Sequence, residues 1–218
     1  CIDMEQRSLK DITLECFRRL RSHPDFRHSE RLGVVLQSYL EDTDRDLPDL
    51  LGWARGEGLG ISVRLVKGAY WDYETVLARQ NGWPVPVHTI KAESDAAYER
   101  HARLLLKNAD ICHMACASHN VRTIAAVMEM AEARGVPHER YEFQVLYGMA
   151  EPVRRGLRNV AGRVRLYCPY GKLLPGMAYL VRRLLENTAN DSFLRQSFAE
   201  SVDTTTLLAD PAVLAERQ

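Results

Sequence analysis

The chain has 218 residues, of which 46% are hydrophobic and 27% are charged. This balance is typical of a globular domain and excludes a disordered tail, a collagenous repeat or a membrane bundle. The 29 basic and 29 acidic residues cancel, so no overall charge attracts nucleic acid or an anionic membrane, and we expect this segment to bind no nucleic acid.

The cysteines and the first residues indicate where the chain comes from. Five cysteines without dense spacing, and no signal peptide, favour a reducing cytoplasm over a secreted disulfide scaffold. No apolar run approaches the roughly 20 residues of a membrane helix. The opening Cys1-Ile2-Asp3-Met4 lacks an initiator methionine and resembles the end of a strand. We therefore expect one domain over residues 1–218, taken from a longer protein and N-terminally incomplete.

Helical and strand-like segments alternate along the chain. Apolar residues recur at helical spacing in five segments: 6–22, 44–57, 94–107, 121–134 and 174–187. Short apolar runs of strand length separate them at 33–39, 61–66, 111–117, 141–145 and 164–168. Such alternation predicts a parallel α/β sheet covered by helices, either doubly wound or closed as a (β/α)8 barrel.

Two observations favour the TIM-type barrel. The Gly-x-Gly-x-x-Gly turn of a Rossmann unit is absent, because Gly56, Gly58 and Gly60 precede a strand instead of following one. Polar residues also follow nearly every strand, where the active face of a barrel collects its chemistry. These strand-end residues are Asp3, Gln37, Lys67, His119, Gln144 and Tyr167. With the Ile2-Asp3 stub the strands number six, so the first two strands of the barrel are expected upstream.

The stretch from Arg64 to Asp72 passes from a strand through a glycine turn to the start of a helix. Backbone amides at such a turn suit a phosphate, with Lys67 adding charge and Gly68 allowing close approach. The stretch predicts a dinucleotide site. The alternative is that Arg64 and Lys67 are solvated and the aromatic residues belong to the core.

The segment Cys116-Ala-Ser-His-Asn120 places a hydroxyl, an imidazole and an amide at one strand end. His119 is a candidate functional residue, although Ser118 or Asn120 could instead cap the following helix. A zinc site formed by Cys112, His113, Cys116 and His119 is disfavoured, because the spacing lacks a C-x-x-C pair and no second cluster completes it. We expect no metal.

Adjacent arginines, Arg182 and Arg183, stand among apolar residues of the last predicted helix. Two guanidinium groups suit a carboxylate, which they grip through fixed hydrogen-bonding forks. Both reach one anion only if the helix borders a cavity, since neighbouring positions diverge by about 100°. The alternative is an intrahelical ion pair with Glu186.

Several of these segments together resemble proline dehydrogenase. The matching stretches are Ile-Asp-Met-Glu at 2–5, Arg-Leu-Val-Lys-Gly-Ala-Tyr-Trp-Asp at 64–72, Ala-Ser-His-Asn at 117–120, Tyr-Glu-Phe-Gln at 141–144 and Tyr-Leu-Val-Arg-Arg-Leu-Leu-Glu-Asn at 179–187. Gly82-Trp-Pro-Val-Pro86 is most similar to the bifunctional bacterial enzyme of the proline utilisation A family, which also carries a glutamate semialdehyde dehydrogenase domain.

The resemblance implies a (β/α)8 barrel that binds FAD and oxidises L-proline to 1-pyrroline-5-carboxylate, the first step of proline catabolism, by hydride transfer to flavin N5. It makes Asp3 and Arg64 the catalytic residues. The flavin contacts that it implies are Met4, Gln37, Arg64, Lys67, Gly68, Ala69, Trp71, Ser118 and His119. The substrate-binding residues that it implies are Tyr70, Tyr167, Arg182 and Arg183.

The resemblance also implies partners and a location: electrons passed to membrane quinone, a fused glutamate semialdehyde dehydrogenase domain, and a cytoplasmic protein that visits the inner membrane face. The sequence departs from the family pattern at Ser118, where threonine is usual, and at Pro169-Tyr170-Gly171, where Pro-Val-Gly is usual. The family's substrate-binding lysine belongs to an early strand outside this chain. The competing hypotheses are a noncatalytic remnant that binds a nucleotide or a partner domain, and another flavin barrel such as a folate reductase.

Overall fold

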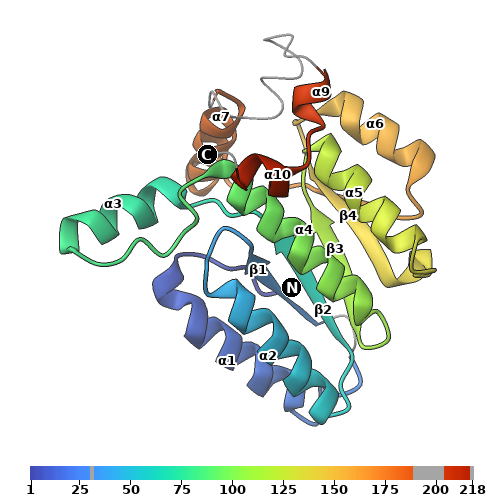
Figure 1. Cartoon of the computed structure of the whole chain (residues 1–218). Helices are drawn as coiled ribbons and strands as arrows, with labels where there is room; N and C mark the ends of the chain where they lie inside the picture. The colour runs from blue at the N-terminus through green and yellow to red at the C-terminus, as the bar shows by residue number, and fades with distance from the viewer. Residues whose placement is uncertain (30–31, 189–203, 217–218) are drawn as a thin grey trace.

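Strands and helices alternate along the chain (Figure 1). The computed structural model describes residues 1–29, 32–188 and 204–216. The strands are β1 (Gly33–Gln37), β2 (Ile61–Val66), β3 (Cys112–Ala117), β4 (Tyr141–Leu146) and β5 (Val164–Tyr167). The helices are α1 (Lys10–Ser22), α2 (Thr43–Gly56), α3 (Trp71–Asn81), α4 (Lys91–Lys107), α5 (Val121–Glu132), α6 (Glu151–Val160), α7 (Leu173–Thr188), α9 (Thr204–Leu207) and α10 (Pro211–Glu216), with 3-10 turns η1 (Arg7–Leu9) and η2 (His138–Arg140).

The five strands form one sheet in the order β1-β2-β3-β4-β5, and every neighbouring pair is parallel. The predicted parallel α/β fold is therefore confirmed. The expected sixth strand at Ile2-Asp3 is reduced to a single parallel bridge between Ile2 and Val34. The bridge still fixes the N-terminal segment beside β1. Closure of the sheet into a barrel stays a prediction.

The two faces of the sheet differ in character. Alternate residues of each strand, such as Val34, Val63 and Phe143, belong to the main hydrophobic core. Figure 1 shows α1, α2, α4 and α5 running along the sheet, and their apolar residues complete this core. The intervening residues, which include Ser62, Arg64, His113, Glu142, Gln144 and Arg165, lie on the opposite face, called the inner face below.

The predicted elements match the observed ones with a few differences. α4 begins at Lys91, three residues before the predicted start, because the Glu93 side chain accepts a hydrogen bond from the Ile90 amide at 3.4 Å and caps the first turn. α6 was not predicted, since Val153 and Leu157 are its only buried residues. Within the described residues, no helix combines the length and apolar character needed to cross a bilayer.

Gly68 and Tyr39 join the loops that follow β1 and β2. Gly68 has φ +144°, and a Cβ atom placed there would lie 2.3 Å from the Tyr39 ring. The Tyr39 amide also donates to the Lys67 carbonyl at 2.7 Å. The sequence predicted that Gly68 allows the close approach of a ligand. In the structure a side chain of the protein makes the close approach.

We expect Gly68→Ala to destabilise the protein by about 1–3 kcal/mol, because the added methyl group overlaps the Tyr39 ring and the backbone conformation favours glycine. Chemical denaturation measures the change. Gly52→Ala is the matched control: Gly52 lies inside α2, where an added methyl group would meet no neighbouring side chain within 4 Å, and this change should stabilise by about 0.5–1 kcal/mol. Equal effects of the two substitutions would contradict the assigned contact.

Candidate active site

The carboxyl ends of all five strands meet at one edge of the sheet, because every pair is parallel. This edge brings together the residues predicted at strand ends except Gln144, which lies inside β4 because that strand continues to Leu146. Gln37 is the last residue of β1, and Tyr167 is the last residue of β5. Lys67 follows β2 directly, and His119 lies two residues after β3. The Ile2 bridge brings Asp3 to the same region.

Arg64 lies at the centre of the candidate site. It projects from β2, its side chain is 15% exposed, and its guanidinium group forms an ion pair with Asp3. The guanidinium carbon also lies 5.9 Å from the centre of the Tyr167 ring. The buried Nε of Arg64 has no hydrogen-bond partner in the described part of the chain. Burial lowers the pKa of Arg64 from its usual value, but an arginine remains charged. The two predicted catalytic residues are therefore in direct contact.

Helix α7 brings two arginines to this edge, and each contacts a different tyrosine. Arg182 donates a hydrogen bond from Nη1 to the Tyr70 hydroxyl at 3.0 Å, with its guanidinium carbon 5.0 Å from the ring centre. Arg183 lies 5.0 Å from the ring of Tyr179. Tyr179 in turn stacks on Tyr167, with 6.2 Å between ring centres. The four predicted substrate-binding residues therefore fall into two groups of contacts: Tyr70 with Arg182, and Tyr167 with Arg183 through Tyr179.

The two arginines of α7 interact with different polar residues. The Tyr70 hydroxyl donates to the Glu5 carboxylate, so Arg182 joins a network with an acidic residue of the N-terminal segment. Arg183 acts electrostatically on His119. The side chain of Glu186, the alternative ion-pair partner, lies outside the described residues. The intrahelical ion pair with Glu186 therefore stays a prediction, as does the carboxylate grip.

Gln37 holds the N-terminal segment in place beside β1. It is 2% exposed, and its Nε2 donates to the carbonyl oxygens of Met4 at 3.4 Å and Glu5 at 3.2 Å. Its buried Oε1 accepts no hydrogen bond from any described residue. Met4 is itself buried, at 7% exposure. Two predicted flavin contacts thus support the segment that carries Asp3.

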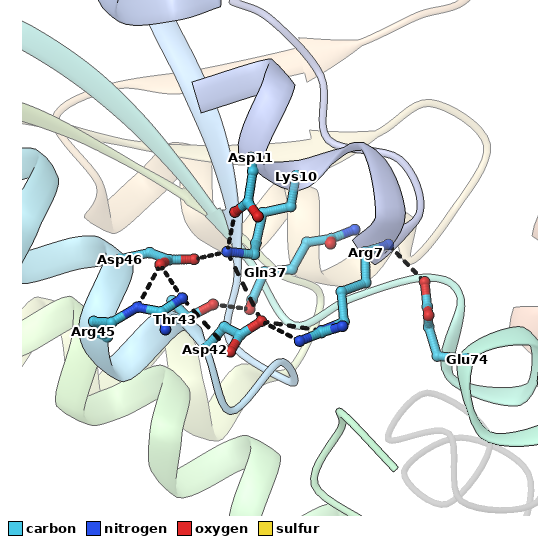
Figure 2. A network of polar contacts seen from close by, with 9 residues as sticks. All are labelled: Arg7, Lys10, Asp11, Gln37, Asp42, Thr43, Arg45, Asp46 and Glu74. Carbon is cyan, nitrogen blue, oxygen red and sulfur yellow. Dashed lines mark hydrogen bonds and ion pairs between the residues drawn. The ribbon is translucent and has the colours of Figure 1, made fainter. Parts of the chain in front are cut away.

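A larger polar network surrounds this support (Figure 2). The Thr43 hydroxyl donates to the Gln37 carbonyl at 2.6 Å, and the Arg7 amide donates to the Glu74 carboxylate at 2.7 Å. The buried ammonium group of Lys10 pairs with Asp46 and lies 3.8 Å from Asp42. The N-terminal segment is therefore attached to β1, α2 and α3. Removing one partner of such a buried pair is strongly destabilising.

The turn after β2 differs from a free phosphate-binding loop. The Lys67 ammonium group lies 2.5 Å from the Asp95 carboxylate of α4. Burial lowers the pKa of Lys67, and the charge of Asp95 partly counteracts that effect. Ala69 is exposed, and the Trp71 indole donates to the His88 carbonyl at 2.9 Å. The predicted charge is present at the turn, but it is already paired within the protein.

His119 is held as a neutral hydrogen-bond donor. Its Nε2 accepts from the Leu146 amide at 3.0 Å, so the proton of the neutral ring must be on Nδ1. Burial, with Arg183 adding a smaller effect, lowers the pKa of His119 to about 4. The next helix is capped by Asn120, whose side chain accepts from the Thr123 amide at 3.2 Å. Ser118 accepts from the Asn120 amide at 3.1 Å.

The four residues considered for zinc do not converge. Cys112 and Cys116 are fully buried on the helix-covered face of β3, whereas His113 lies on the inner face. The Cys116 thiol accepts a hydrogen bond from the Tyr98 hydroxyl at 3.1 Å. Within the described ranges, no group of three or more His, Cys, Asp or Glu side chains is arranged to bind a metal ion.

Sequence reasoning missed three residues that complete the site: Glu5, Asp95 and Tyr179. Glu5 bonds to Tyr70, Asp95 pairs with Lys67, and Tyr179 stacks between Tyr167 and Arg183. Glu5 stands two positions after Asp3, and Tyr179 stands four positions before Arg183, which is one helical turn. These spacings were usable signals. Asp95 gave none, because its partner is 28 residues away.

Comparison with known proteins identifies the family. The family model described as proline dehydrogenase matches residues 1–196. The chain belongs to the proline dehydrogenase family. The "Bifunctional protein PutA" of Escherichia coli is 34% identical over 226 residues, which cover 99% of this chain and 17% of that protein. The "Proline dehydrogenase" of Deinococcus radiodurans is 34% identical over 90% of this chain and 56% of that protein.

Solved structures show the same fold. The crystal structure of proline utilization A from Bdellovibrio bacteriovorus, inactivated by N-propargylglycine, is 54% identical with a TM-score of 0.94, over 96% of this chain and 22% of that chain. Proline utilization A from Bradyrhizobium japonicum, as its D779W mutant, is 34% identical with a TM-score of 0.90, over 97% of this chain and 22% of that chain. The chain spans about a sixth of the length of its bifunctional relatives and about half that of the shorter enzymes.

The lowered pKa of His119 predicts a pH dependence of stability. In the unfolded state His119 binds a proton below about pH 6.5, whereas in the folded state it binds one only below about pH 4. The free energy of unfolding therefore decreases as the pH falls through this window. The loss amounts to about 3 kcal/mol. His119→Gln, which keeps an acceptor for the Leu146 amide, should flatten this part of the curve. Urea denaturation between pH 4 and 7.5 measures the slope, and identical slopes for both proteins would contradict a neutral His119.

Proposed function

We propose that this chain provides the active site of an FAD-dependent proline dehydrogenase that oxidises L-proline to 1-pyrroline-5-carboxylate. One observation carries the proposal beyond family membership. The ion pair between the largely buried Arg64 and the exposed Asp3 lies at the carboxyl edge of the sheet, together with both arginines of α7 and the rings of Tyr70, Tyr167 and Tyr179. Cations and aromatic rings at one edge fit a planar cofactor and an anionic substrate.

The residues present fit a flavin. A flavin ring carries an N–H donor and carbonyl acceptors, so its pyrimidine edge needs both kinds of partner. Gln37 Oε1 is an acceptor and Arg64 Nε a donor that have no partner among the described residues, and His119 adds an Nδ1–H donor. When bound, the flavin supplies a hydride acceptor at N5.

Nine residues would hold that cofactor. They are Met4, Gln37, Arg64, Lys67, Gly68, Ala69, Trp71, Ser118 and His119. Arg64 would provide positive charge where negative charge develops, and Asp3 would hold its guanidinium group in place. Lys67 would act through the field of its ion pair, because its ammonium group is shared with Asp95.

Tyr70, Tyr167, Arg182 and Arg183 would bind the substrate. The two guanidinium groups would grip the carboxylate of proline, while the tyrosine rings would enclose its apolar ring. Orientation is the main task of these residues, because a hydride moves only when the donor carbon faces its acceptor at close range. The carboxylate grip would choose which ring carbon lies nearest to the cofactor.

The remaining parts of the proposal concern the longer protein. The chain would be one domain, residues 1–218, that completes a (β/α)8 barrel with two upstream strands. Electrons would pass to membrane quinone from the inner membrane face, and a glutamate semialdehyde dehydrogenase domain would be fused to it, as the likeness to bifunctional relatives supports. A flavin spectrum that L-proline bleaches in the purified full-length protein tests the activity. A colourless protein that does not bind added FAD would refute it.

Arg64→Met in the full-length protein should slow flavin reduction by proline about a hundredfold while FAD content stays near that of the wild type. The lost charge matters most when negative charge develops at the site. Stopped-flow reduction and the flavin-to-protein absorbance ratio measure the two effects separately. A normal reduction rate at full FAD content would remove Arg64 from the catalytic residues.

Arg182→Lys and Arg183→Lys should each raise the Michaelis constant for proline about ten- to a hundredfold. Lysine keeps the charge but loses the planar fork, a loss of about 1.5–3 kcal/mol of binding. Arg155→Lys, on an exposed arginine of α6, is the matched control and should change nothing. The variants should also lose discrimination against pyrrolidine, which lacks the carboxylate. Unchanged constants and discrimination would refute the grip.

A further inference from the structure

Glu142 is a buried carboxylate on the inner face of the sheet that the proposed reaction does not use. Glu142 is only 2% exposed to solvent. Arg165 of β5 donates to it from Nε at 2.7 Å and from Nη2 at 2.9 Å. The Gln144 side chain, two positions later on β4, donates from Nε2 at 2.6 Å. One carboxylate thus accepts three hydrogen bonds from two neighbours.

These contacts fix the orientation of the Gln144 amide. Burial raises the pKa of Glu142, but the hydrogen bonds from Arg165 and Gln144 outweigh that effect and keep the pKa below its usual value. An ionised carboxylate only accepts hydrogen bonds, so the nitrogen of Gln144 must face it. The oxygen on the same amide carbon must point away from Glu142. Among the described residues, none donates a hydrogen bond to this oxygen.

Gln144 lies beside the candidate site. The sheet register places it opposite Ala117 of β3 and Arg165 of β5. The next residue on the same face, Leu146, pairs with Tyr167, and its amide donates to His119. Gln144 is therefore one pleat below the edge formed by His119 and Tyr167. Through Ala115 and Ala117 of β3, the register also places Gln144 on the same face of the sheet as Arg64, next to the edge at which we propose that the ligand binds.

We propose that Gln144 is a ligand-binding residue whose Oε1 accepts a hydrogen bond from a ring N–H of the bound ligand, and that Glu142 is its positioning residue. This inference rests on the proposed function. That function offers two sources of such an N–H: the pyrimidine ring of the flavin and the secondary ammonium group of proline. Both sources require the same oriented acceptor.

The test uses the full-length protein with Gln144→Leu and Glu142→Gln. Gln144→Leu removes the acceptor. It should raise the dissociation constant of the ligand that donates the N–H, either FAD or proline, about tenfold. Glu142→Gln lets both amides rotate, so it should weaken the same ligand to a similar extent, and the double variant should lose no more than either single variant. Arg155→Lys, at an exposed arginine of α6 that does not contact Glu142 or Gln144, is the control and should bind as the wild type does. If Glu142→Gln does not fold, Gln144→Leu with the Arg155→Lys control still decides the outcome.

Two titrations identify the N–H. FAD is titrated into the flavin-free protein, and proline is compared with cyclopentanecarboxylate, which keeps the carboxylate but has no N–H. Weaker FAD binding by Gln144→Leu supports the flavin ring. A loss for proline without a loss for cyclopentanecarboxylate supports the ammonium group. Wild-type affinities in both titrations, or equal losses for proline and cyclopentanecarboxylate at unchanged FAD affinity, would overturn the inference. A wild type that binds neither FAD nor proline would overturn the proposed function itself, and the inference with it.

Discussion

The division of the sheet into an apolar face under the helices and an inner face that carries the polar side chains of the strands is the constraint on which the rest of the structure depends. Side chains alternate along a strand, so burying Val63 and Leu65 under the helices forces Arg64 onto the other face. The same rule places Glu142 and Gln144 opposite Phe143. A shift of one residue in any strand would exchange core and site together. The packing that stabilises the fold therefore also sets which residues are available for chemistry.

The sequence allowed much of this organisation to be predicted because it depends on local pattern. The strands at 61–66 and 141–145 were found from short apolar runs, and their observed bounds differ by at most one residue. α6 was missed because two buried residues in ten give too weak a periodicity. The family resemblance, more than any pattern, assigned roles to Asp3 and Met4, and those individual roles stay predictions. The opening residues predicted the end of a strand, but its pairing with Val34 of β1 is a long-range contact that the local pattern does not specify.

The partners of the charged site residues could not be predicted from the sequence, because they lie far along the chain or on another helical turn. Lys67 reads as a free cation at a glycine turn, yet Asp95 from the next helix but one neutralises it. Arg182 and Arg183 read as one anion clamp, yet each rests on its own tyrosine. In both cases the sequence singled out the charged residue, while its partner came from a distant part of the chain or from another turn of the helix. Whether a charged side chain is available to a ligand or is already neutralised within the protein depends on these partners.

The contact between Gly68 and Tyr39 has a consequence for how this protein can change over evolutionary time. The ring at position 39 occupies the volume that any side chain at position 68 would need. A larger residue at 68 becomes tolerable only after the ring is lost, and even then the positive φ angle remains a separate cost. Substitutions at positions 39 and 68 are therefore coupled, and this coupling constrains the sequences of the loops after β1 and β2 together.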